Sequence, residues 1–260
     1  MNPFFFGSSG RQLFGMYHPP RGTTTRTTGV VLCYPFGQEY MRAHRAFRQL
    51  ANLLTKAGFP VLRFDYSGSG DSAGASDAAS LAQWQDDIAT AMEELRDTAE
   101  VQRVALVGLR LGAALALRAA AARDDVTAVV LWDPVVDGRG YVTELEALAE
   151  VPVAARGNDE EEAWGVMGFP VTPAFRRELV ALDLRTEASA VVPKRALVIA
   201  AAARAQDAAL DEALRAAGAA TTYRVLPSEG SWGEVDNYGS ALIPQQIVQG
   251  IVAYFEGETA

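Results

Sequence analysis

The residues with the clearest chemical meaning form the turn from Gly108 to Gly112, which reads Gly-Leu-Arg-Leu-Gly. An apolar run that predicts a strand precedes it, and a run rich in small residues that predicts a helix follows it. This is the setting of a G-x-S-x-G turn, which exposes a nucleophilic serine. Arg110 takes the serine position. A guanidinium stays protonated, so it cannot serve as the nucleophile of acyl transfer.

Acyl transfer through a serine also needs a general base, nearly always a histidine on the loop after the last strand. We expect the last strand at residues 221–226, and the loop behind it, residues 227–236, contains no histidine. The two histidines of the chain, His18 and His44, both lie far upstream of the turn. The sequence therefore argues against ordinary Ser-His-Asp acyl transfer.

Arg110 requires a negative partner, because the start of a helix already carries positive potential from its free N–H groups and its dipole. Asp133, after the next strand, and Glu39, in the loop after an earlier strand, are the best candidates within the chain. The alternative is the carboxylate or phosphate of a ligand, held as a bidentate pair. The sequence thus predicts that Arg110 forms a structural ion pair or binds an anionic ligand. The two are compatible, since a ligand carboxylate can replace a carboxylate of the protein.

Four carboxylates could act as a general base in place of a histidine. Each of them could equally be an ordinary carboxylate at the surface or in an ion pair. Burial could raise the pKa of any of them to a value suited to a base. The candidates are Glu39, Asp71, Glu229 and Asp236. Glu39 stands out because its loop abuts the expected site. The glycines of Gly68-Ser-Gly70 resemble a phosphate-binding pair, but Ala73 leaves G-x-G-x-x-G incomplete.

Four further residues lie at positions where chemistry would be expected. Cys33 is either a buried inert thiol or a substitute nucleophile. We expect His44 to open a helix, where it either approaches the expected site or is a capping or surface histidine. Asp207 follows the strand after which the acid of a triad usually stands, but without a histidine to orient it also fits a helix start. Ser231, in the loop without a histidine, can act only as a hydrogen-bond partner.

Composition excludes several classes of function. The chain of 260 residues has 23 basic and 32 acidic residues, a net charge of −9, which argues against binding to nucleic acid or to an anionic membrane. A single cysteine excludes an internal disulfide, and nothing suggests a metal site or a cofactor. We see neither a signal peptide nor an apolar run long enough for a membrane span, and expect a cytoplasmic protein. A homodimer stays open.

Strands and helices alternate along the chain, a pattern typical of a mostly parallel sheet with helices on both faces. The alternation breaks after Val136, and we expect residues 137–189 to form a small cap insertion and residues 1–136 and 190–260 to form the core. After an opening hairpin, strands are expected at 29–34, 59–64, 103–108, 126–132, 195–200 and 221–226, and helices at 43–56, 80–98, 111–118, 207–217 and 243–254.

Four segments together resemble the α/β-hydrolase superfamily: residues 34–40, 62–72, 108–113 and 131–136. More narrowly, they resemble the bacterial branch called exosortase-A-system-associated hydrolase 2 and its relatives, which also carry Gly-Leu-Arg-Leu-Gly at this turn. The resemblance implies the α/β-hydrolase fold, with the turn as its nucleophile elbow. It further implies an oxyanion-type pocket formed by the N–H of Leu111 and that of Phe36 or Gly37.

Three functions stay open. The first is an enzyme with a non-serine site that acts on a small carbonyl compound, ester or thioester, within a bacterial biosynthetic context. The second is an inactive homologue whose pocket binds a small acid or a partner protein. The third is a hydrolase with an unrecognised nucleophile, such as Cys33 or a serine of the cap insertion. In each case the expected ligand is small, and is anionic or contains a carbonyl.

Overall fold

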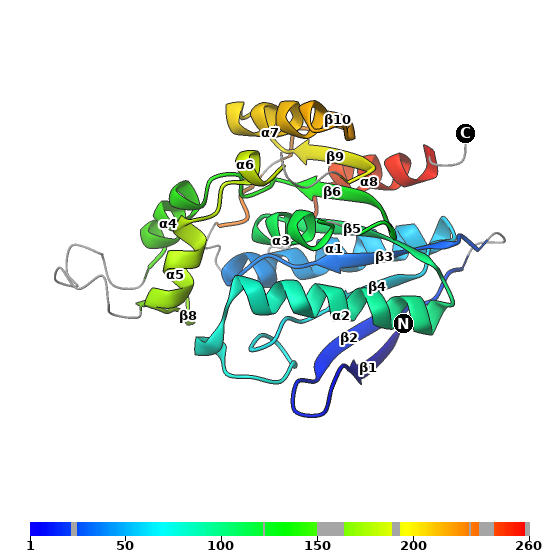
Figure 1. Cartoon of the computed structure of the whole chain (residues 1–260), viewed down its shortest axis with the longest axis horizontal. Coiled ribbons are helices and arrows are strands. Elements are labelled where there is room, and N and C mark those ends of the chain that lie inside the picture. Colours follow the sequence, from blue (N-terminus) through cyan, green and yellow to red (C-terminus); the bar gives the residue numbers. More distant parts are fainter. Residues whose placement is uncertain are drawn as a thin grey trace.

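The computed structural model describes residues 1–21, 25–121, 123–149, 164–188, 193–228, 230–233 and 242–257. These residues build one eight-stranded sheet in the order β1-β2-β4-β3-β5-β6-β9-β10 (Figure 1). Its strands are β1 (Asn2–Phe6), β2 (Leu13–His18), β3 (Thr28–Cys33), β4 (Val61–Phe64), β5 (Arg103–Leu109), β6 (Val126–Trp132), β9 (Arg195–Ala200) and β10 (Ala220–Val225).

The sheet is parallel from β4 to β10, whereas the β1–β2 hairpin joins it in antiparallel pairing. Its central strands are apolar runs buried on both faces, as expected for a parallel sheet covered by helices. The fold class predicted from the sequence is therefore confirmed. Strands β6 and β9 have the predicted bounds, since each apolar run is flanked by polar or turn-forming residues.

Helices cover both faces of the sheet (Figure 1). On one face α1 (Gln38–Lys56) packs against α8 (Gln245–Glu256). On the other face α2 (Leu81–Ala99) packs against α3 (Leu111–Ala119), and α6 (Leu184–Ala188) packs against α3 and α7 (Ala205–Ala216). A short 3₁₀ helix, Ser76–Ala78, precedes α2.

Helix α1 begins five residues before the predicted start at Ala43. Gly37, with φ of 64°, turns the chain directly from the loop after β3 into the helix, and Glu39 in the first turn complements the helix dipole. Glu39 therefore lies on a helix rather than in a loop. His44 is the seventh residue of α1 and does not open it.

The described part of the predicted cap insertion consists of α4 (Gly138–Ala147), a hairpin of β7 (Trp164–Val166) and β8 (Phe169–Val171), α5 (Pro173–Val180) and α6. Helices α4 and α5 pack together at one end of the sheet (Figure 1). Polar contacts tie this region to the core: Glu178 accepts a hydrogen bond of 2.6 Å from the N–H of Leu81, and Glu187 pairs with Arg118. The bounds of the insertion stay a prediction.

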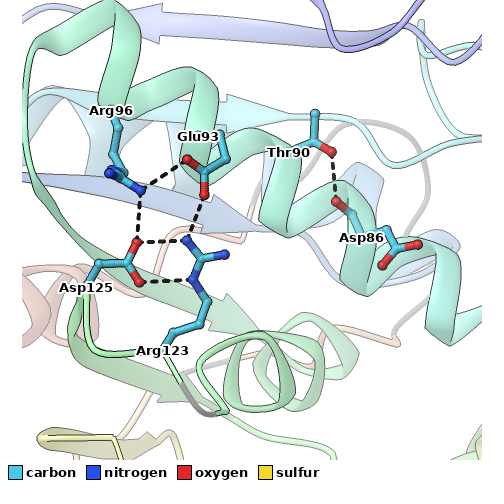
Figure 2. A network of polar contacts seen from close by, with 6 residues as sticks. All are labelled: Asp86, Thr90, Glu93, Arg96, Arg123 and Asp125. Carbon is cyan, nitrogen blue, oxygen red and sulfur yellow. Dashed lines mark hydrogen bonds and ion pairs between the residues drawn. The ribbon is translucent and has the colours of Figure 1, made fainter.

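A surface network links α2 to the turn before β6 (Figure 2). Arg123 binds both Glu93 and Asp125, at 2.8 and 2.7 Å, and Arg96 contacts the same two carboxylates at 3.1 and 3.3 Å. All four side chains are at least one-fifth exposed. Ion pairs with this much exposure contribute little each, so the network adds little to the stability of the fold.

Candidate binding site at the elbow

The turn between β5 and α3 has the strained backbone of a nucleophile elbow. Arg110 adopts φ of 54° and ψ of −119°, a backbone conformation that residues other than glycine rarely adopt. Its N–H donates to the carbonyl of Trp132, and its own carbonyl accepts from the N–H of Val135, at 3.0 and 3.2 Å. The elbow is thus fixed to the end of β6 and projects the arginine side chain from the sheet.

The flanking glycines are there because the chain segments lie too close for a side chain. A Cβ on Gly108 would lie 2.2 Å from the carbonyl oxygen of Gly112, and a Cβ on Gly112 would lie 2.2 Å from the carbonyl oxygen of Cys33. Helix α3 therefore crosses the ends of β5 and β3 almost in backbone contact. This close crossing is what requires glycine on both sides of Arg110.

The guanidinium of Arg110 is held by two carboxylates and one aromatic ring. Its Nε donates to Oε1 of Glu39 at 2.7 Å, and its Nη2 donates to Glu144. The ring of Tyr141 lies 5.4 Å from its central carbon, and the Tyr141 hydroxyl donates to Oε2 of Glu39 at 2.9 Å. Of the two partners expected within the chain, Glu39 is present; Asp133 binds other groups.

Burial governs the charges in this cluster. The side chains of Arg110 and Glu39 are 9% and 6% exposed, whereas that of Glu144 is 56% exposed. Burial raises the pKa of Glu39, and the opposing attraction of Arg110 does not fully offset it. Burial would lower the pKa of Arg110, but the neighbouring Glu39 and Glu144 outweigh this and raise it. The Arg110 charge is therefore already compensated within the protein.

Asp133, directly after β6, accepts a hydrogen bond from a tryptophan, as the acid of a triad accepts one from its histidine. Its Oδ2 accepts from the indole N–H of Trp232 at 2.9 Å, and its Oδ1 accepts from the N–H of Ala201 at 2.9 Å. Trp232 lies on the loop after β10, where a triad histidine would lie. Arg110, Asp133 and Trp232 thus follow the chain order of serine, acid and histidine. An indole N–H only donates and cannot accept a proton.

A cavity of about 700 Å³ opens beside these groups. Its volume lies in the range of small-molecule sites, roughly 300–1,000 Å³. Its polar wall includes Glu39, Arg110, Asp133, Glu144 and Arg204, and the rest is mostly apolar. The complete lining is Glu39, Arg110, Asp133, Tyr141, Glu144, Leu145, Ala147, Leu148, Ala201, Ala202, Arg204, Ser228, Gly230, Ser231, Trp232, Gly233, Leu242 and Pro244.

Among the described residues, the two arginines of this wall keep guanidinium donors that no protein acceptor uses. Both oxygens of Glu39 and both oxygens of Asp133 already accept a hydrogen bond. By contrast, Nη1 of Arg110 and Nη1 of Arg204 donate to no other residue in these parts of the chain. A ligand that offers an acceptor oxygen therefore matches the cavity.

The remaining candidates lie apart from this chemistry. Cys33 is completely buried, and burial raises its pKa well above that of a reactive thiol, so it is not a nucleophile. His44 is exposed, stacks on Tyr34 and does not line the cavity. Asp207 is buried in an ion pair with Arg204 at 2.7 Å, and only Ser231 joins the cavity wall.

The predicted oxyanion donors divide between different places. Leu111 directly follows Arg110 as the first residue of α3, but it is fully buried and does not line the large cavity. Phe36 and Gly37 line a separate, smaller cavity instead. The oxyanion pocket expected from the N–H of Leu111 and that of Phe36 or Gly37 stays a prediction; next to it, α1 begins at Gln38 and presents Glu39 to the large cavity.

Of the candidate bases, Asp71 is exposed and away from the cavity. Glu229 and Asp236 lie outside the described residues. Sequence reasoning missed Tyr141, Glu144, Trp232 and Arg204. Tyr141 and Glu144 are spaced i, i+3, which places them on one helix face, and this spacing was the available signal.

Among the described residues, no cluster of histidine, cysteine or carboxylate side chains could hold a metal ion. No helix in the same parts of the chain is both long and apolar enough to cross a membrane.

Comparison with known proteins identifies relatives of the same fold. Residues 30–157 match the family model for serine aminopeptidase, S33. The palmitoyl-protein thioesterase ABHD10, mitochondrial, is 32% identical over 149 residues in Pongo abelii and 31% in Homo sapiens. Each match covers 56% of this chain and 44% of the relative, so the chain spans less than half the length of these curated relatives.

Solved structures are similar over nearly the whole chain. Est1E from Butyrivibrio proteoclasticus, with ferulic acid bound, superposes with a TM-score of 0.69 at 14% identity and covers 97% of both chains. The mouse alpha/beta hydrolase domain-containing protein 10 superposes with a TM-score of 0.62 at 17% identity, over 99% of this chain and 98% of that one. With the family match, the sheet order and the elbow geometry, these likenesses establish that the chain belongs to the α/β-hydrolase superfamily.

Proposed function

We propose that this protein binds a small neutral carbonyl compound, such as an ester or thioester with an apolar body, and does not form an acyl-enzyme from it. The observation that carries the proposal is the hydrogen bond from the Trp232 indole to Asp133. It occupies the place of a histidine–acid pair with a group that cannot accept a proton. Arg110, in the place of the nucleophile, is held by Glu39 and Glu144.

The cavity supports the choice of ligand. Its free guanidinium donors favour a carbonyl or ester oxygen, and its apolar walls favour a hydrocarbon body. An anionic ligand, which the sequence led us to expect, would meet an Arg110 that already has two carboxylate partners. A neutral carbonyl needs only the remaining N–H groups and does not have to displace Glu39 or Glu144. The thioesterase name of the curated relatives is consistent with a ligand of this class.

The first test asks whether acyl transfer is prevented by Arg110 in the position of the nucleophile and Trp232 in the position of the base. In a Glu39→Gln background, which avoids a buried unpaired carboxylate, we compare Arg110→Ser with and without Trp232→His. Asp133 would orient the introduced imidazole as it now orients the indole. We expect an acyl-enzyme burst with an activated ester only when both changes are present. A burst from Arg110→Ser/Glu39→Gln alone, or fluorophosphonate labelling of the unaltered protein, would refute the proposal.

The second test concerns the ligand. Ethyl hexanoate, hexanoate and hexan-1-ol share an apolar chain and differ only in the polar group, and their binding is measured by titration calorimetry. We expect ethyl hexanoate to bind more tightly than the other two. Leu148→Trp, directly after α4, fills the cavity and should abolish binding, whereas Thr143→Trp on α4, outside the lining, should not. Tighter binding of hexanoate would instead favour the anionic ligand, and binding that survives Leu148→Trp would exclude this cavity.

Turnover through a non-serine site is the second candidate, and one observation favours it. Glu39 lies on the cavity wall, and burial raises its pKa, as suits a general base. Hydrolysis of ethyl hexanoate by the unaltered protein, lost in Glu39→Gln and kept in Glu144→Gln, would support this candidate. Stoichiometric binding without product would support the binding function.

A further inference from the structure

A second cavity, of about 210 Å³, shares no lining residue with the first. The two approach each other at the start of α1, where Glu39 faces the large cavity and Tyr40 the small one. Half of the lining residues of the small cavity are aromatic, and none carries a positive charge. The lining is Pro35, Phe36, Gly37, Tyr40, Met41, Tyr66, Ser69, Gly70, Trp84 and Phe169.

The aromatic side chains form a connected set that packing holds in place. Tyr66 stacks on Trp84 with ring centres 5.1 Å apart, and Phe36 lies 6.0 Å from Trp84 and 6.1 Å from Phe169. The Trp84 indole N–H also donates to the carbonyl of Ser67 at 3.0 Å, which fixes its orientation. The π faces of such rings carry negative partial charge and attract cations.

A buried carboxylate lies directly behind this wall. Asp65 is 8% exposed, and its Oδ1 accepts from the Tyr40 hydroxyl at 2.8 Å. Its Oδ2 accepts from the N–H of Asp71 at 3.1 Å and lies 2.1 Å from where a Cβ on Gly70 would stand. Glycine at position 70, itself part of the cavity wall, therefore leaves room for this carboxylate directly behind the wall.

Asp65 has no cationic partner among the described residues, since no ion pair joins it to any of them. Burial raises its pKa; the hydrogen bonds from the Asp71 N–H and the Tyr40 hydroxyl oppose this effect, the Asp71 charge adds to it, and His44 opposes it. An ionised carboxylate offers about four lone-pair positions, and Asp65 uses two of them. A buried carboxylate in this state gains stability from a cation brought close to it.

We propose that the small cavity binds a small organic cation, such as a trimethylammonium group, against its aromatic rings with Asp65 as the counter-ion. Two independent features point to this ligand class: the aromatic wall without a basic residue, and the uncompensated carboxylate behind it. The cavity is smaller than most sites for drug-sized ligands, which suits a single ammonium head group. Met41, 61% exposed, and the exposed Gly70 mark its opening.

The test uses choline and its neutral analogue of the same shape, 3,3-dimethylbutan-1-ol, with the unaltered protein. Binding is measured by titration calorimetry and by saturation-transfer NMR on the methyl protons. We expect choline to bind at least about tenfold more tightly than the alcohol, since only choline gains from the ring faces and the carboxylate. Equal affinities, or no saturable binding of either compound, would overturn the proposal.

Two variants with the same change of charge locate the site. Asp65→Asn should weaken choline binding at least about tenfold and leave the alcohol unaffected. Asp86→Asn, an exposed carboxylate on α2, is the control and should leave both affinities unchanged. Tyr40→Phe keeps the ring and the fold but removes one bond to Asp65, so it should retain the preference for choline. Choline binding that is insensitive to Asp65→Asn, in a variant that melts as the unaltered protein does, would refute Asp65 as the counter-ion.

Discussion

Replacing Arg110 by methionine should destabilise the protein far more than removing its exposed partner. Arg110 and Glu39 are 9% and 6% exposed and lie 2.7 Å apart, so the methionine would leave a buried carboxylate with only the Tyr141 hydroxyl. Breaking a buried pair from one side costs about 3–5 kcal/mol. Glu144, 56% exposed, pairs with the same guanidinium, and Glu144→Gln should cost less than about 1 kcal/mol.

The cost should also depend on pH. Burial already raises the pKa of Glu39, and loss of Arg110 would raise it further. The folded variant would then hold a proton that the unfolded chain releases, so its stability falls as pH rises from below the unfolded pKa through the folded one. Arg110→Met should therefore be milder at pH 5 than at pH 8.

Urea denaturation at both pH values measures these free energies, and thermal melting should show a decrease of about 6–20 °C for Arg110→Met at pH 8, from roughly 2–4 °C per kcal/mol. The double variant Arg110→Met/Glu39→Gln should recover much of the loss, because it removes both charges together. Strictly additive effects of the two changes, or an effect of Arg110→Met no larger than that of Glu144→Gln, would refute the buried-pair argument.

Three other outcomes are expected. Arg110→Gly should be more stable than Arg110→Ala by about 1–2 kcal/mol in urea denaturation, because only glycine adopts φ of 54° and ψ of −119° without strain; equal stabilities would mean that the elbow relaxes. Gly112→Ala should lower the melting temperature strongly or prevent folding, because the new Cβ would lie 2.2 Å from the carbonyl oxygen of Cys33. Gly165→Ala should leave the melting temperature nearly unchanged, because a Cβ at this position would have no atom within 4 Å. Burial and the adjacent Arg63 lower the pKa of His18 to about 4. Between about pH 4 and 6.5 the unfolded chain therefore holds a proton at His18 that the folded chain does not, so the free energy of unfolding should rise with pH in this range. A His18→Gln variant with an unchanged slope would contradict this.

Much of the fold could be predicted from the sequence because its strands are apolar runs with clear ends. Strand β6 stops at Asp133-Pro134, and α2 begins after Ser80, whose side chain caps the helix. The start of α1 could not be predicted in the same way. No side chain caps this helix, and its entry depends on Gly37 at positive φ.

The candidate site could be predicted only in part. Arg110 and Glu39 follow neighbouring parallel strands, and the ends of such strands meet at one edge of the sheet, so their contact was accessible to sequence reasoning. Glu144 and Tyr141 depend on how α4 packs over the elbow, which no local pattern specifies. The role of Trp232 does not follow from its sequence position, because it acts as a donor to Asp133 in a loop where a base is expected.

The elbow backbone carries less functional meaning than its shape suggests. Its positive φ is usually explained by the need to expose a nucleophile, yet here it exposes an arginine. The close crossing of α3 over β3, with Gly112 against the carbonyl of Cys33, explains the turn without any catalytic demand. Once this crossing exists, position 110 must point away from the sheet whatever its side chain. Function in this fold is therefore decided by the side chains that meet there, in this case Arg110, Glu39, Asp133 and Trp232.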